Sequence, residues 1–273
     1  MALLDPIPDP RQYSFDPKDY PRPGLYVLQE FRAAMAPLIG VQLPILQIPR
    51  HALLAFEPSQ IGTITGTLMD ACIPQLDKVL PKAELEEMEA HGLSKHEGIL
   101  GEREGYPDFF HEKSGIRAEL KLLYVNPPSE IKMKSPPTPR EPSARLTQKV
   151  TLKNVEPDRD VLLVLAYQLR LRSDEPELVS PTIIDVGVFP MINCILARDR
   201  RLIRGGGKWF GNFETPAILS KRGKAKLAKG QSLDDTTYGR KESEGKDYNE
   251  DTNFGKLKRI PDPALKAFLK KHR

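Results

Sequence analysis

The stretch "GYPDFFHEKSGIRAELKLLYV", residues 105–125, decides the fold because it contains two strand-like segments separated by a short loop. In residues 116–122 the even positions are apolar, whereas the odd positions Arg117, Glu119 and Lys121 are charged. Successive side chains of a strand point to opposite faces. We therefore predict a strand with an apolar core face and a second face that carries a row of charges.

The loop between the two segments sets their alignment. The segment "HEKSG" has the length and the glycine of a hairpin loop. If residues 112–115 form a four-residue loop, Asp108 lies opposite Glu119, and directly opposed residues share a face with Cβ atoms about 4.5–5.5 Å apart. A loop one residue longer or shorter puts the two acids on opposite faces, unless a bulge restores the alignment.

Two opposed carboxylates repel each other, so their pairing favours a cation between them. Mg²⁺ and Mn²⁺ prefer oxygen ligands, and Mg²⁺ needs only one or two carboxylates with water completing its octahedron. Lys121 lies roughly 6.6 Å beyond Glu119 on the same face. Its ammonium group can favour hydroxide formation beside the metal or stabilise charge on a phosphorane-like transition state. The alternative is a half-exposed strand whose charges are simply hydrated.

The set of Pro107 and Asp108 followed by Glu119-x-Lys121 resembles the PD-(D/E)XK nuclease superfamily. In chain length and in its lack of fused motor motifs, the sequence looks most like a type II restriction endonuclease. The resemblance implies an α/β fold with a mixed β-sheet flanked by helices, a restriction-endonuclease-like core. It also implies divalent-metal-dependent hydrolysis of DNA phosphodiester bonds.

The resemblance further implies roles for individual residues. Asp108, Glu119 and Lys121 would be catalytic, and Asp108, Glu119 and the carbonyl of Leu120 would hold Mg²⁺, with Mn²⁺ as a substitute. Family members commonly add an acid from an upstream helix, for which Asp70 and Glu84 are both candidates; the sequence does not choose between them.

The implied partner is double-stranded DNA, cut at a short specific sequence by a homodimer. Two alternatives stay open. One is another nuclease of the superfamily, such as a homing, repair or junction-resolving enzyme. The other is a non-catalytic nucleic-acid-binding or scaffold protein, in which the Glu-x-Lys pair belongs to a surface strand.

The net charge of +4 is divided unevenly along the chain. Residues 198–273 contain 20 Lys and Arg against 10 Asp and Glu, a net charge of +10, whereas residues 1–197 contain 21 against 27, a net charge of −6. A basic segment of this kind is typical of polyanion binding. We name Arg200, Arg201, Arg204 and Lys208 as candidate DNA-binding residues.

The chain divides into an extended Pro- and Asp-rich N-terminal arm, residues 1–24, and a single nuclease domain, residues 25–273, whose C-terminal part is basic and rich in loops. We predict helical spacing from residue 25 to 40, and a helix with Ser59 as its N-cap that is perturbed near Pro74. The other expected elements are a helix over 82–92, a loop over 135–143, a central strand over 160–171, a strand with or without a continuation over 181–197, a polar loop over 220–256 and a basic helix over 262–273.

Other sequence features exclude several classes of protein. No long apolar run or signal peptide is present, so we expect a cytoplasmic protein with no membrane partner. Cys72 and Cys194 are too few for a disulfide framework and are expected to be free, buried thiols. The segment "GGGK" at 205–208 lacks the spacing of a P-loop, and no GxSxG motif occurs. The five histidines lack metal-ligand spacing, and His111 is interpreted as a loop residue.

Overall fold

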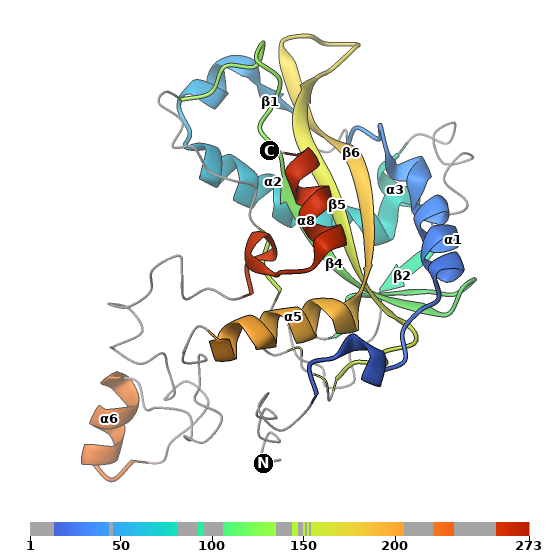
Figure 1. Ribbon diagram of the computed structural model, residues 1–273. Coiled ribbons are helices and arrows are strands. Elements are labelled where there is room, and N and C mark those ends of the chain that lie inside the picture. Colours follow the sequence, from blue (N-terminus) through green and yellow to red (C-terminus); the bar gives the residue numbers. More distant parts are fainter. Residues whose placement is uncertain are drawn as a thin grey trace.

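A single six-stranded sheet organises the computed structural model, with the strand order β1-β6-β5-β4-β3-β2 (Figure 1). The model describes residues 14–43, 46–80, 92–95, 106–134, 144–146, 150, 152, 154–204, 221–231 and 255–272. The strands are β1 Ile48–Pro49, β2 Leu93–Lys95, β3 Phe109–His111, β4 Ile116–Tyr124, β5 Asp160–Leu171 and β6 Leu178–Pro190. Strands β4 and β5 run parallel, and the other neighbouring pairs are antiparallel.

Helices cover both faces of this sheet. The α-helices are α1 Leu25–Met35, α2 Pro58–Cys72, α3 Leu76–Val79, α5 Met191–Arg204, α6 Lys221–Ala228 and α8 Pro263–Lys271. Short 3₁₀ helices are η2 Pro17–Asp19, η3 Ala36–Leu38, η4 Arg50–Leu54, η5 Ile73–Gln75 and η8 Leu257–Arg259. Figure 1 shows α8 in front of the strands and α5 below their lower end. The predicted α/β fold, a mixed sheet flanked by helices, is confirmed.

The central strand β5 divides the core into two layers. Its residues Leu163 and Leu165 pack in one cluster with side chains of α1 and α2. Leu162 and Val164, which point to the opposite face, pack in a second cluster with side chains of α5 and α8. A strand covered on both faces needs a nearly continuous apolar run. The central strand predicted over 160–171 is therefore confirmed, with the same bounds.

The N-terminal helices match the predicted spacing, but one helix start was wrong. Helix α1 and the following η3 occupy the region predicted to be helical, and η5 interrupts the next helix around Pro74 as expected. Helix α2 begins at Pro58 and is capped by Glu57 instead of Ser59. Glu57 and Gln60 form a reciprocal capping box, which satisfies two free backbone N–H groups at once and outcompetes a single serine cap.

The C-terminal half departs from the predictions in two places. The apolar run over 181–197 contains the end of β6 and the start of α5. Helix α5 was not predicted, because a short apolar run does not distinguish a strand from a buried helix. Helix α6 lies inside the predicted polar loop over 220–256, so that prediction was wrong for residues 221–228. The C-terminal basic helix is confirmed as α8.

Several smaller predictions can also be compared with the structure. Cys72 and Cys194 are free and buried, as expected. Residues 14–24 of the predicted arm include η2. The loop predicted over 135–143 lies outside the described residues. The same is true of the helix predicted over 82–92, except for its last residue. Within the described parts of the chain, no helix is long and apolar enough to cross a bilayer.

The β3–β4 hairpin has the predicted four-residue loop. His111 pairs with Ile116, and Phe109 pairs with Ala118. Gly115 closes the loop with a φ of 68°, and its N–H donates to the carbonyl of His111 over 2.9 Å. His111 itself is not a loop residue, as we had interpreted it. It is a buried residue of β3 whose ring packs edge-on against Phe31, because the strand extends to the last residue before the turn.

Replacing Gly115 by alanine should destabilise the hairpin. A positive φ is costly for any residue with a Cβ, by about 1–2 kcal/mol, so Gly115→Ala should lower the free energy of unfolding by that amount. Gly66→Ala is the control, because Gly66 lies within α2 and an added Cβ would make ordinary contact at 3.5 Å with the Tyr167 hydroxyl. There alanine should gain about 0.5–1 kcal/mol. Urea unfolding measures both, and equal effects would contradict the loop geometry.

Candidate active site

Asp108 and Glu119 lie side by side at the open end of the hairpin. The β3–β4 register places Phe109 opposite Ala118, so Asp108, one residue earlier, falls next to Glu119. The backbone N–H of Leu120 donates to Asp108 Oδ2 over 2.8 Å. This bond fixes the Asp108 carboxylate against β4, and the alignment predicted from the length of the loop is therefore present.

Lys121 completes the cluster. Its Nζ donates to Glu119 Oε1 over 2.6 Å and to the Leu120 carbonyl over 2.8 Å. The same Nζ lies 3.7 Å from Asp108 Oδ2. The three oxygen-bearing groups that the sequence nominated as metal ligands thus surround a single positive charge.

The charged face of β4 is largely buried, which does not fit the alternative of a half-exposed strand with hydrated charges. The Glu119 side chain is 4% exposed and that of Lys121 is 19% exposed, whereas that of Asp108 is 33% exposed. The single-strand pattern missed this burial because the covering residues come from distant parts of the chain. The site is consequently open to solvent on the Asp108 side and closed behind Glu119.

Burial changes the protonation of these groups. It raises the pKa of Glu119 to about 7; the Lys121 ammonium opposes this rise, and the nearby Asp108 carboxylate adds to it. Burial also disfavours the charge of Lys121, but the carboxylates of Glu119 and Asp108 outweigh it and raise the pKa of Lys121. The site therefore holds the Lys121 ammonium group between the carboxyl groups of Glu119 and Asp108, and the Glu119 carboxyl accepts few hydrogen bonds.

The donor set fits a divalent cation. No hydrogen-bond donor of the described residues reaches Glu119 Oε2, although this oxygen is buried. A carboxylate oxygen left in this state gains from coordinating a cation. The described residues include no group of three or more His, Cys, Asp or Glu side chains suited to a metal. Two carboxylates and a carbonyl, with water, still satisfy the oxygen-rich octahedron of Mg²⁺.

The two candidates for an upstream acid have different outcomes. Asp70, on α2, lies close enough for its charge to contribute to the raised pKa of Lys121. Glu84 lies outside the described residues. Asp70 therefore lies near the site, and the choice between the two acids stays open.

The candidate DNA-binding residues are separate from this cluster. Arg200 and Arg201 are partly buried on α5, and Arg200 donates to the Phe15 carbonyl over 2.6 Å. Its guanidinium carbon also lies 5.9 Å from the centre of the Phe15 ring. Arg204 ends α5, with its side chain outside the described atoms, and Lys208 is outside the described residues. Arg200 therefore already holds the N-terminal segment, and its role in DNA binding stays a prediction.

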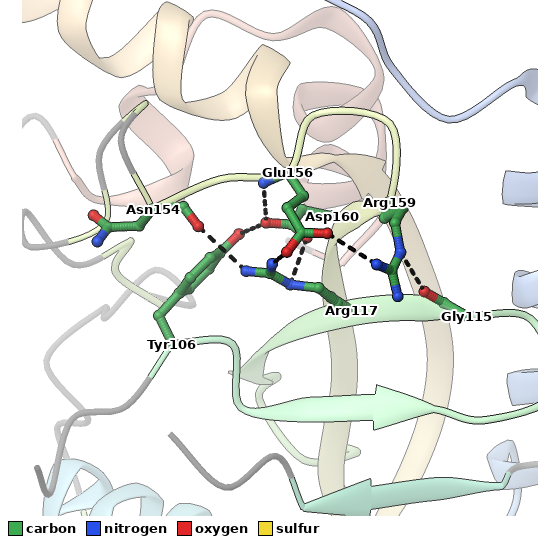
Figure 2. A network of polar contacts seen from close by, with 7 residues as sticks. All are labelled: Tyr106, Gly115, Arg117, Asn154, Glu156, Arg159 and Asp160. Atoms are coloured by element: carbon green, nitrogen blue, oxygen red, sulfur yellow. Dashed lines mark hydrogen bonds and ion pairs between the residues drawn. The ribbon is translucent and has the colours of Figure 1, made fainter. Parts of the chain in front are cut away.

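Sequence reasoning missed a second group of polar residues beside the site. Arg117 precedes Glu119 by two positions on β4, and its partners Asn154, Glu156 and Asp160 lie around the start of β5 (Figure 2). Tyr106, two residues before Asp108, also bonds to Asp160. The available signal was the odd position of Arg117 on the strand, which places it on the same face as Glu119 and Lys121.

Comparisons with family models, curated proteins and solved structures found no match to this chain. The function of the cluster formed by Asp108, Glu119 and Lys121 is therefore inferred from its geometry.

The raised pKa of Glu119 predicts a pH-dependent stability for the metal-free protein. Because the folded-state pKa of about 7 exceeds the usual value of about 4.3, the contribution of this carboxyl is fully present below pH 4.3 and is lost as pH rises through 7. The loss is at most about 4 kcal/mol. Glu119→Gln should flatten this slope, whereas Glu130→Gln, at an exposed position, should keep it. Urea unfolding between pH 4 and 8 with a chelator tests this, and parallel slopes for parent and Glu119→Gln would contradict it.

Proposed function

We propose that the protein is a divalent-metal-dependent endonuclease that hydrolyses phosphodiester bonds of double-stranded DNA at a short specific sequence, as a type II restriction enzyme does. The observation that carries this proposal is the convergence of Asp108, Glu119 and the Leu120 carbonyl on one cationic group, Lys121 Nζ. A surface strand with hydrated charges has no need for such convergence.

The roles of the residues follow from their positions. Asp108, Glu119 and the Leu120 carbonyl would hold Mg²⁺ or Mn²⁺, and a bound ion of this kind supplies a more acidic water and a polarised phosphate. Lys121 would leave the carboxylates for the phosphate or the attacking water, because its stem is long and its ammonium is attracted to either. Asp108, whose side chain is the most exposed of the three, would lie on the side of the site that DNA reaches.

The wider setting of the proposal comes from the resemblance. It includes a homodimer that cuts both strands and a role in restriction-modification; the cytoplasmic location is carried over from the sequence analysis. A repair, homing or junction-resolving nuclease would use the same site, and sequencing the ends of plasmid fragments separates these activities. A non-catalytic DNA-binding protein would bind DNA in a salt-sensitive manner without cutting it.

Substituting the two acids should abolish cleavage by removing metal ligands. Asp108→Ala and Glu119→Ala should each lower both the affinity for Mg²⁺ and the rate of plasmid cleavage, with Mg²⁺ titrated by calorimetry beside a gel assay. Glu112→Ala, an exposed acid in the neighbouring hairpin loop, is the control. Cleavage by Glu119→Ala at the parental rate would exclude this cluster as the active site.

Lys121 should affect metal binding and chemistry in opposite directions. Lys121→Met removes a cation that competes for the same oxygens, so Mg²⁺ should bind the DNA-free protein more tightly. The same substitution removes a preorganised charge, and the cleavage rate should fall by about 10²–10³-fold. Lys113→Met, at an exposed lysine of the hairpin loop, should change neither quantity. Weaker Mg²⁺ binding by Lys121→Met would contradict the competition.

The basic C-terminal part should contribute phosphate contacts. Neutralising Arg200, Arg201 and Arg204 together should weaken binding to all DNA sequences and reduce the salt slope by up to about one unit for each lost contact. Fluorescence anisotropy at several salt concentrations measures the slope. Because Arg200 also anchors Phe15, Arg200→Gln alone shows how much of the change comes from loosening the N-terminal segment. An unchanged slope in the triple variant would exclude these residues from the interface.

A further inference from the structure

A partly buried polar network lies beside the candidate active site, and Asp160 is its centre. Asp160 is the first residue of β5, with a fully buried side chain. Its Oδ1 lies 3.0 Å from Arg117 Nε, and its Oδ2 accepts hydrogen bonds from the Tyr106 hydroxyl over 2.5 Å and from the Glu156 N–H over 2.9 Å (Figure 2). The hydrogen bonds of Asp160 therefore fall on Oδ2, whereas Oδ1 pairs with Arg117 by charge alone, without hydrogen-bond geometry.

The two arginines of the network bind these segments together. Arg117 forms an ion pair with Glu156, donates to the Asn154 carbonyl over 3.2 Å and lies over the Tyr106 ring at 5.6 Å from its centre. Arg159 donates to Glu156 over 3.0 Å and to the Gly115 carbonyl in the hairpin loop over 3.1 Å. Two positive and two negative side chains offset one another, which stabilises the buried charges of Arg117 and Asp160, while the side chains of Glu156 and Arg159 are each 45% exposed.

Asp108 needs an anchor of this kind. It immediately precedes β3, so the β3–β4 ladder begins one residue after it. Its carboxylate lies beside that of Glu119, and the two negative charges repel each other. The bond from the Leu120 N–H and the contact with Lys121 restrain the carboxylate itself, and Lys121 is the group that a metal would displace. If a metal displaced Lys121, the Leu120 N–H would still hold one carboxylate oxygen and the ladder would still hold the chain after Asp108, so the chain before Asp108 is the part that needs a further restraint.

We propose that Tyr106 is a positioning residue, whose hydroxyl bond to Asp160 anchors the chain two residues before Asp108 and so keeps the Asp108 carboxylate beside Glu119. This inference rests on the proposed nuclease function and adds a residue to it. The anchor is rigid, because Asp160 belongs to the central strand and is itself held by Arg117 and the Glu156 N–H. In this inference Tyr106 acts through Asp108 and is not itself a catalytic residue.

Tyr106→Phe tests the anchor with little change in packing. The substitution keeps the ring over Arg117 and removes only the hydroxyl. The Mg²⁺ concentration for half-maximal plasmid cleavage should rise by about 10–100-fold, the loss typical of removing a group that orients a metal ligand. The rate at saturating Mg²⁺ should return to within a few-fold of the parental rate. Calorimetric titration of the DNA-free protein with Mg²⁺ should show the same loss of affinity.

Tyr124→Phe is the matched control. Tyr124 is also a partly buried tyrosine, on β4, and its hydroxyl contacts the Met133 sulfur over 3.4 Å without reaching the network. This variant should keep the parental Mg²⁺ requirement, and thermal unfolding of both variants corrects for lost stability.

The outcomes separate the inference from the function on which it rests. A parental Mg²⁺ requirement in Tyr106→Phe overturns the anchor while the nuclease proposal stands, and so does an equal shift in both variants. A fall in rate without a shift in the Mg²⁺ requirement overturns it as well, because the effect would not pass through Asp108. If the parent neither binds Mg²⁺ nor cuts DNA, the proposed function fails and the anchor with it.

Discussion

The structure depends on how the charged face of β4 is neutralised after it is buried. Arg117, Glu119 and Lys121 alternate along a strand that is covered on both faces, and an unpaired charge there would strongly destabilise the fold. Arg117 finds its partners at the start of β5, and Lys121 lies between Glu119 and Asp108. The same pairing that makes the strand stable therefore assembles both the candidate site and the network beside it.

The parts of the fold that could be predicted from sequence are those set by local rules. The length of the hairpin loop and Gly115 determined the alignment of Asp108 with Glu119, because both acids belong to one hairpin. The continuous apolar run of β5 likewise identified a central strand without knowledge of its neighbours. Local rules failed at α5. The apolar run over 181–197 continues through Pro190, the last residue of β6, although the structure changes there from strand to helix.

The remaining features depend on contacts between residues far apart in the chain. Arg117 meets Glu156 across 39 positions and Tyr106 meets Asp160 across 54 positions, so no spacing rule could have joined them. The burial of Glu119 has the same origin, because packing around the strand and not its own alternation decides exposure. The sequence alone could thus name Asp108, Glu119 and Lys121. It could not predict the polar network around Asp160 or show that Asp70 lies near Lys121.

A single carboxylate also links the two helical layers that the sheet separates. Asp185, next to an irregularity in the β5–β6 ladder, contacts Arg32 of α1 at 3.6 Å and, from the other layer, Lys271 at 2.7 Å and His272 at 2.9 Å. Burial alone would raise the pKa of Asp185, but the bonds from Lys271 and His272 lower it. A peptide tag that pulled residues 271–272 away would therefore leave the buried Asp185 carboxylate with Arg32 as its remaining cationic partner among those named, and so would weaken the link between α1 and the layer on the opposite face.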